Sequence, residues 1–355
     1  MHYICRKKGE DTKTVNMKEN SDLQLSIIIP VYQVEKYVRP CLESVYKQGL
    51  DDEVFEVIIV NDGTKDRSME VIQDIIDKHK NITVINQENQ GLSMARNNGM
   101  AIARGEYLLM PDSDDLLVEN SVKPLLEKAL ETKADMVVAE FVEKSDEEIK
   151  CDSIPQRNYQ QIESTGKELY LNESLLNHVN IWRTLYRRLF LQENIITFIG
   201  GIYFEDIPFT HQCYLKAKKC IYSNTLLYIY RTGHQTISAA SSFTMRHAHD
   251  LCIAIAKTWE LRNMEGLSNV IKKKHTDHIY DRYKYLLYRI LYCIPEKKHK
   301  IEAIKVLKKY APDIKFTNNT KQILTSLLFR NVPAFYISLY LFRKKYLASY
   351  PNKSV

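Results

Sequence analysis

The chain has 355 residues, 45% of them hydrophobic, and a formal net charge of +6 at pH 7. This size allows a full catalytic domain and leaves about a hundred residues for a second unit. Its 7 cysteines include no Cys-x-x-Cys pair, which argues against a zinc site and a disulfide framework and favours a reducing cytoplasm. Residues 1–24 are polar and lack the apolar core of a signal peptide, so we expect a loose tail, with Met1 or Met17 as the native start.

Strands and helices are expected to alternate along the next part of the chain. Residues 25–32 are typical of a buried strand that ends in a proline turn, and residues 35–48 have helical spacing. A strand over 55–60 and a helix over 66–79 repeat this unit. Further strands are expected over 82–86, 107–110 and 136–141, and a helix opens within 89–97. The alternation predicts an α/β fold: a mostly parallel sheet with helices on both faces.

Three carboxylates lie within residues 112–115, directly after an apolar strand. Asp112 and Asp114 are two residues apart and can share one face of an extended chain, whereas Asp115 is expected to turn away and cap the next helix. Hard cations such as Mg²⁺ and Mn²⁺ prefer oxygen ligands and leave positions open for substrate phosphates. The cluster therefore predicts a divalent cation with a diphosphate, and a solvated acidic turn is the alternative.

Two more functional candidates lie near the ends of predicted strands and helices. Asp62 comes after the second strand, and Arg96 lies near the start of the third helix. Ligands of parallel α/β sheets bind at the carboxyl ends of the strands. We therefore expect one crevice to collect Asp62 and Arg96 together with Asp112 and Asp114.

In these ordered motifs the chain resembles the family 2 glycosyltransferases, which have the nucleotide-sugar-binding GT-A fold. The resemblance extends over residues 25–238 and rests on Ile29-Pro30-Val31-Tyr32 with Glu35, on Val60-Asn61-Asp62-Gly63, on 89–97, on 112–115 and on Phe204-Glu205-Asp206. It implies a catalytic domain over 25–240 and a basic helical region over 245–355. The chain has no Gln-x-x-Arg-Trp, the motif of processive relatives, so we expect one sugar per encounter in cell-surface polysaccharide synthesis.

The resemblance also assigns a donor site for a nucleotide sugar, with UDP as the expected nucleotide. Asp114 would coordinate Mn²⁺ or Mg²⁺ between the two phosphates, and Asp112 would contact the ribose or the metal's water shell. Arg96 would organise the carboxylates or the diphosphate. The full donor set that the resemblance implies is Pro30, Tyr32, Glu35, Asp62, Gly91, Arg96, Asp112, Ser113 and Arg231.

The resemblance makes Asp206 the expected general base. It would take the proton from the acceptor hydroxyl as that oxygen attacks the anomeric carbon opposite the leaving group, which inverts the anomeric centre. Glu205 would orient the pair or bind the acceptor, and its charge would raise the proton affinity of Asp206. A surface acidic pair in a turn is the alternative.

Trp182 and His234 have two interpretations each. Trp182 either stacks on an acceptor sugar or belongs to the core. Residues 226–230 are expected to form an edge strand, and the following segment resembles one that covers the diphosphate, with Arg231 and His234 as candidates. His234 is otherwise an ordinary loop histidine.

The charge is divided unevenly along the chain. From residue 245 onward 22 Lys and Arg stand against 8 Asp and Glu, a net +14, so the rest carries −8. A basic helical tail favours a polyanionic surface. Within it, the apolar stripe over 332–342 is too short to span a bilayer, and it either lies on anionic lipid, packs on the catalytic domain or forms a homodimer interface. No nucleic-acid-binding module is recognised, so no nucleic-acid partner is expected.

These features predict a cytoplasmic enzyme, either free or peripheral on the inner membrane face, with a glycan or lipid-linked glycan acceptor. A nucleotidyltransferase acting on sugar phosphates is one alternative, but the turn after the first strand lacks the expected glycine. A non-catalytic GT-A scaffold protein is another, and the presence of Asp112, Asp114 and Asp206 argues against it.

Overall fold

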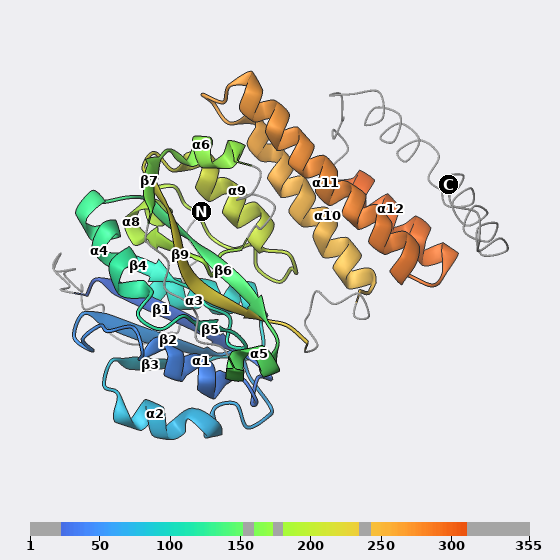
Figure 1. Ribbon diagram of the computed structural model, residues 1–355. Helices are drawn as coiled ribbons and strands as arrows, with labels where there is room; N and C mark the ends of the chain where they lie inside the picture. The colour runs from blue at the N-terminus through green and yellow to red at the C-terminus, as the bar shows by residue number, and fades with distance from the viewer. Residues whose placement is uncertain (1–22, 152–159, 173–179, 234–242, 311–355) are drawn as a thin grey trace, which may run out of the picture.

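The fold of the chain is given by a computed structural model, which describes residues 23–151, 160–172, 180–233 and 243–310. These residues form a nine-stranded sheet with helices packed around it, and a group of C-terminal helices beside it (Figure 1). Met1, Met17, His234 and the stripe over 332–342 lie outside the described residues.

The first four strands are parallel and neighbour one another in the order β3-β2-β1-β4. Every residue of β1 is buried and all but Ser26 are apolar, which is typical of a strand that is covered on both faces. The four strands are β1 (Leu25–Val31), β2 (Phe55–Asn61), β3 (Ile82–Asn86) and β4 (Tyr107–Leu109). The predicted parallel β-α units are confirmed in this half of the sheet.

Two of the predicted helices are shorter than their sequence pattern suggested. The carboxylate of Asp66 accepts a hydrogen bond from the backbone N–H of Ser68 at 3.1 Å and holds these residues in a turn before the helix. The backbone N–H of Tyr37 closes a similar turn onto the carbonyl of Val34 at 2.8 Å. The regular segments are α1 (Val38–Val45) within 35–48, and η1 (Glu70–Ile72) with α2 (Gln73–Lys78) within 66–79.

Helix α3 (Leu92–Ile102) packs closely against the parallel strands and carries Arg96. A Cβ atom added to Gly99 would lie 2.4 Å from Cγ2 of Ile28 in β1, which is closer than van der Waals contact permits. Glycine at this position therefore lets the helix backbone approach the sheet. The approach fixes where α3 begins at the carboxyl edge of the strands.

The second half of the sheet is mixed, which the sequence pattern did not predict. Strand β8 is antiparallel to both β4 and β6, whereas β9 is parallel to β6 and antiparallel to β5 and β7. The strand expected over 226–230 is present as part of β9, but its predicted edge position is wrong, because β9 has neighbours on both sides. These strands are β5 (Leu116–Leu117), β6 (Met136–Lys144), β7 (Gln161–Ser164), β8 (Thr184–Arg187) and β9 (Cys220–Arg231).

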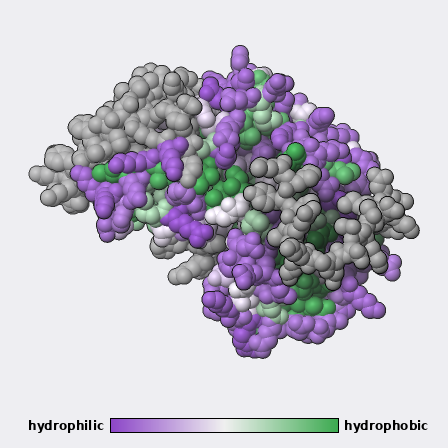
Figure 2. Space-filling view, turned by 180° about the vertical axis from the view of Figure 1, so that it is seen from behind, coloured by the Kyte–Doolittle hydropathy of each residue, from purple (hydrophilic) through white to green (hydrophobic). Residues whose placement is uncertain are grey.

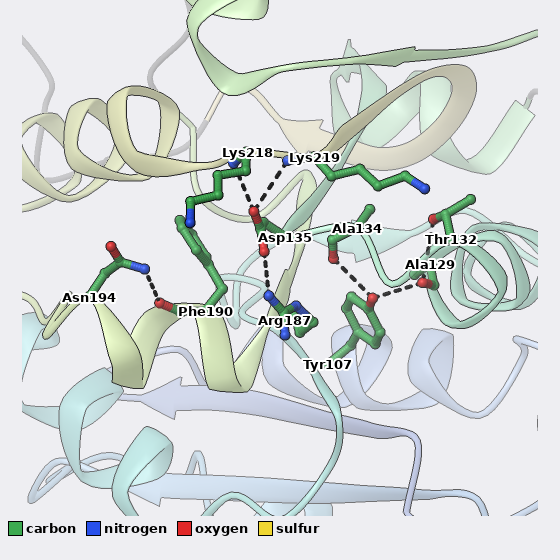
Figure 3. A network of polar contacts seen from close by, with 10 residues as sticks. All are labelled: Tyr107, Ala129, Thr132, Ala134, Asp135, Arg187, Phe190, Asn194, Lys218 and Lys219. Atoms are coloured by element: carbon green, nitrogen blue, oxygen red, sulfur yellow. Dashed lines mark hydrogen bonds and ion pairs between the residues drawn. The ribbon is translucent and has the colours of Figure 1, made fainter. Parts of the chain in front are cut away.

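A buried aspartate ties this mixed half together at the amino end of β6 (Figure 3). Asp135 is 6% exposed and accepts a hydrogen bond from Arg187 at 2.5 Å and from the backbone N–H groups of Lys218 and Lys219 at 2.8 and 3.2 Å. It therefore joins β6 to β8 and to the start of β9. The helices of this half are α4 (Val122–Thr132), α5 (Asp146–Cys151), α6 (Gly166–Leu171), α8 (Arg188–Glu193) and α9 (Asp206–Lys216).

The C-terminal helices form a second hydrophobic core. Helices α10 (Met245–Glu260), α11 (Asn269–Cys293) and α12 (Lys297–Tyr310), with the short η3 (Leu261–Asn263) after α10, lie together beside α9 (Figure 1). Ile207 of α9 belongs to this core. In the part of the chain that the structure describes, no helix has the length and apolar content needed to cross a bilayer. Among the described residues on the face seen in Figure 2, most are hydrophilic, and apolar side chains form smaller patches between them.

Candidate active site at the carboxyl ends of the strands

Asp62 ties the end of β2 to the start of α3. Its carboxylate is buried and accepts hydrogen bonds from the side chain of Gln87 at 2.7 Å and from the backbone N–H groups of Gln90 and Gly91 at 2.8 and 2.9 Å. Gly91 has a φ of +84°, a conformation that favours glycine, and it directly precedes α3. Asp62 and Gly91 thus lie together, and their roles in donor binding stay predictions.

The proline turn, with three of the predicted donor contacts, lies at the same edge of the sheet. Pro30 is part of β1 and pairs with Val60, so the strand runs one residue past the proline. Tyr32 follows with 41% of its surface exposed. Glu35 accepts a hydrogen bond from the backbone N–H of Arg67 at 3.1 Å, which links this turn to the loop after β2. These residues stay predicted donor contacts.

The acidic cluster forms a candidate cation site. One carboxylate oxygen from each of Asp112, Asp114 and Asp115 lies within 4.8 Å of the others. Burial raises the pKa of Asp115 to about 8, and the charges of Asp114 and Asp112 add to this. Burial also raises the pKa of Asp112 to about 6, against the opposing charge of Arg96. The donor set fits a hard divalent cation such as Mg²⁺ or Mn²⁺, because a cation would relieve the repulsion among the carboxylates.

Asp115 does not cap a helix, contrary to the prediction. It is 1% exposed and accepts hydrogen bonds from the hydroxyl of Tyr228 at 2.8 Å and from the backbone N–H of Arg231 at 2.7 Å. The hydroxyl of Tyr228 in turn accepts a hydrogen bond from the backbone N–H of Asp112 at 3.1 Å. Strand β9 therefore holds the loop that carries the acidic cluster, including the buried Ser113.

Arg96 connects the acidic cluster to the acidic pair Glu205 and Asp206. Its side chain is 2% exposed, donates from Nη1 to Glu205 at 2.6 Å, and forms a short ion pair from Nη2 with Asp112. Charge-assisted hydrogen bonds of this kind are strong, and a buried guanidinium with two carboxylate partners has a fixed position. Arg96 thus contacts two carboxylates, and its role in organising them or the diphosphate stays a prediction.

Asp206 is the first residue of α9, and Glu205 directly precedes it. Burial and the negative charge of Glu205 raise the pKa of Asp206 to about 7, while the positive charges of Arg282 and Arg96 oppose this rise. A carboxylate with a pKa near neutral pH is suited to general base catalysis. The base role of Asp206 stays a prediction, and sequence reasoning had not identified Arg282 of α11 as a neighbour.

Arg231 lies against the acidic loop rather than in open solvent. Its Nε donates to the backbone carbonyl of Asp114 at 2.8 Å, its Nη1 forms a short ion pair with Asp146, and its guanidinium stacks 5.1 Å from the ring centre of Tyr37. Asp146 is another neighbour that the sequence did not reveal, because nothing local links it to residue 231. Its predicted contact with the diphosphate stays untested.

Trp182 packs as a core residue in this structure. It is 6% exposed, its ring stacks on Tyr228 with centroids 4.0 Å apart, and the ring of Phe141 packs against it in an edge-to-face arrangement with centroids 5.0 Å apart. Tyr230 stacks more distantly at 5.9 Å. Because aromatic side chains surround the ring, the geometry favours the core interpretation over stacking on an acceptor sugar.

Residues 26–194 match the family described as Glycosyl transferase family 2. The chain carries a family 2 glycosyltransferase domain. This glycosyltransferase domain includes Asp62, Arg96 and the acidic cluster, and the predicted family is confirmed.

Relatives of the glycosyltransferase domain agree with this assignment. Glycosyltransferase GlyA of Streptococcus pneumoniae is 33% identical over 236 residues, which are 64% of this chain and 33% of that protein. The uncharacterized glycosyltransferase EpsJ of Bacillus subtilis is 34% identical over 219 residues, 60% of this chain and 62% of EpsJ. The chain therefore matches one third of the length of GlyA and under two thirds of EpsJ.

A solved structure extends the likeness beyond the matched segment. Residues 1–349 of TarS from S. aureus, in complex with UDP-GlcNAc, superpose with a TM-score of 0.66 at 21% identity, and the match covers 81% of this chain and 80% of that one. The likeness confirms the predicted GT-A-type α/β fold.

Proposed function

We propose that the chain is an inverting, metal-dependent glycosyltransferase that transfers a single sugar from a UDP-linked donor. The observation that carries the proposal is the placement of Arg96, which contacts Asp112 of the acidic cluster and Glu205 beside Asp206. The donor side and the acceptor side of the expected reaction are thus linked through one buried side chain.

In the proposed reaction, Asp206 accepts the proton of the acceptor hydroxyl as the oxygen attacks the anomeric carbon opposite the diphosphate. Its raised pKa supports this step, because a base with a pKa near 7 binds the proton well and is about half ionised at neutral pH. Glu205, held by Arg96, orients the acceptor side. A divalent cation held by Asp114 and Asp112 would neutralise charge on the leaving nucleoside diphosphate.

The choice of UDP rests on two supports. The family resemblance implies a nucleotide-sugar donor, and the TarS structure with the same fold holds UDP-GlcNAc. That ligand belongs to TarS, so UDP-GlcNAc is the first donor to test here and other UDP-sugars follow.

The proposed acceptor is a glycan or a lipid-linked glycan of a cell-surface polysaccharide, reached at the inner face of the cytoplasmic membrane. The net charge of +14 after residue 245 supports a surface that carries anionic lipid or phosphate. A homodimer through the same region is the competing use of these residues.

Calorimetric titration tests the donor site directly. UDP, with GDP as the control ligand, is titrated into wild type, Asp114→Ala and Asp77→Ala, each with and without Mn²⁺. Asp77 lies on α2 with an exposed side chain and serves as the matched aspartate control. We expect Mn²⁺-dependent binding of UDP that Asp114→Ala loses and Asp77→Ala keeps. Binding of neither nucleotide to wild type would overturn the proposal and favour the scaffold alternative.

A further inference from the structure

The residue before the acidic pair Glu205 and Asp206 has an unusual backbone conformation. Phe204, the residue before Glu205, has a φ of +63°. Few residues other than glycine adopt this left-handed region, and a bulky residue there costs free energy that surrounding contacts must offset. The contacts that hold Phe204 therefore determine where Glu205 and Asp206 lie.

Helix α10 supplies a hydrogen bond to this segment. Oδ2 of Asp250 accepts a hydrogen bond from the backbone N–H of Tyr203 at 3.2 Å. Asp250 is 4% exposed, and its other oxygen lies 3.0 Å from Nδ1 of His249, while Arg246 forms an ion pair with it at 3.6 Å. The aspartate is fixed by its own neighbours and can in turn fix the backbone at residue 203.

The same face of α10 also holds the rings of the segment. Tyr203 stacks on His247 with centroids 4.4 Å apart and an interplanar angle of 8°. The guanidinium of Arg246 lies 5.0 Å from the ring centre of Tyr203, and Phe204 meets His247 edge-on at 6.4 Å. Stacked aromatic pairs and cation–π contacts each add specificity of orientation. We call Arg246, His247 and Asp250 the α10 clamp.

The residue on the other side of the acidic pair is also held by the C-terminal helices. Ile207 is 3% exposed in the second core, and Phe204 packs against that core. Between them, Glu205 is turned toward Arg96 of the glycosyltransferase domain. The residues on both sides of the acidic pair are thus held by the C-terminal helices, and the carboxylate of Glu205 is held by Arg96.

We propose that the α10 clamp is a positioning device for the acidic pair, with Asp250 as its central positioning residue. The proposal rests on the proposed function, and it makes the C-terminal helices a working part of the active site. Tyr203 and Phe204 transmit the position, because they directly precede Glu205 and Asp206.

The test compares Asp250→Ala, Asp250→Asn and Asp135→Ala. Asparagine keeps an oxygen that can accept the hydrogen bond of Tyr203, so Asp250→Asn should largely restore what Asp250→Ala loses. Asp135 is the matched control, because it is an equally buried aspartate that accepts backbone hydrogen bonds from Lys218 and Lys219 (Figure 3). It lies at the amino end of β6, away from the acidic pair.

Hydrogen exchange of the peptide over 203–209 is the first readout. We expect Asp250→Ala to speed exchange there by about tenfold, and Asp135→Ala to leave it at the wild-type rate. Unchanged exchange in Asp250→Ala, or an equal rise in Asp135→Ala, would overturn the proposal. If Asp250→Ala does not fold, Arg246→Ala replaces it, because that side chain is 65% exposed, and about threefold faster exchange is expected. Exchange at the wild-type rate in that variant would likewise overturn the proposal.

Turnover is the second readout, measured as release of UDP from UDP-GlcNAc. Misplacement of a general base lowers kcat more than it weakens substrate binding. We therefore expect Asp250→Ala to lower kcat by about a hundredfold and to keep KM within about twofold of wild type. Equal impairment of Asp250→Asn and Asp250→Ala would overturn the role of the hydrogen bond. Hydrogen exchange needs no substrate. If the wild type binds no UDP, the proposed function is rejected, and the exchange rates still test whether the α10 clamp positions the acidic pair.

Discussion

Arg96 joins two carboxylates that serve different steps of the proposed reaction, and this separation can be tested residue by residue. We expect Asp206→Asn to keep Mn²⁺-dependent UDP binding and to lower sugar transfer by about 10²- to 10⁴-fold, because only the proton acceptor is lost. Calorimetry and UDP release measure the two effects. If Asp206→Asn loses as much UDP affinity as Asp114→Ala, the two residues do not have separate roles.

The pH profile of kcat/KM reports on the base itself. Activity should rise as pH passes about 7, because burial and Glu205 raise the pKa of Asp206 and the ionised form is the active one. The charge of Arg282 lowers that pKa, so Arg282→Gln should move the rising limb to higher pH. Lys284→Gln is the control on the same helix, since Lys284 pairs with Asp281 at 2.6 Å. Coinciding profiles for wild type and Arg282→Gln would contradict this assignment.

At the scale of elements, the packing of α3 decides where Arg96 lies. We expect Gly99→Ala to destabilise the fold by about 1–3 kcal/mol, because the new methyl would lie 2.4 Å from Ile28 and the gain in helix propensity is only about 1 kcal/mol. Thermal unfolding measures the effect. Ile102→Ala on the same helix is the control, since Ile102 is 45% exposed. A melting temperature of Gly99→Ala at or above that of wild type would show that the helix can move away.

The elements that the sequence predicted are those that local patterns specify. Apolar runs followed by polar residues predicted β1 to β4 and brought Asp62, Arg96 and the acidic cluster to one edge. The pairing of β8 and β9 is non-local and leaves no signal in either strand. For the same reason the local pattern does not indicate the contacts of Asp115, because its partners Tyr228 and Arg231 are more than a hundred residues away.

The acceptor side was harder to predict than the donor side. Asp206 could be assigned from the family resemblance, but the contacts of Tyr203 with Asp250 and the approach of Arg282 depend on how two separate cores pack together. Trp182 is a further example of non-local contacts, because its place in the sequence does not reveal that Tyr228 covers its ring.

At the scale of the whole molecule, the uneven charge makes a prediction about surfaces. We expect the full chain to sediment with vesicles of phosphatidylglycerol and not with those of phosphatidylcholine, because 22 basic residues follow residue 245. Binding should weaken as NaCl rises, since salt screens exposed charges. Equal sedimentation with both lipids, or with neither, would contradict a role of the basic region at an anionic membrane.

The position of β9 has a consequence for exchanging parts between related enzymes. The family match ends at residue 194, yet β9 runs from Cys220 to Arg231. It pairs with β6 on one side and with β5 and β7 on the other. A fragment cut at 194 would leave open strand edges that invite aggregation, and would also lose the tyrosine that steadies the acidic loop. Chimeras that graft this catalytic unit onto another C-terminal region should therefore place their junction after residue 231 to keep β9, and after α10 to keep the α10 clamp as well.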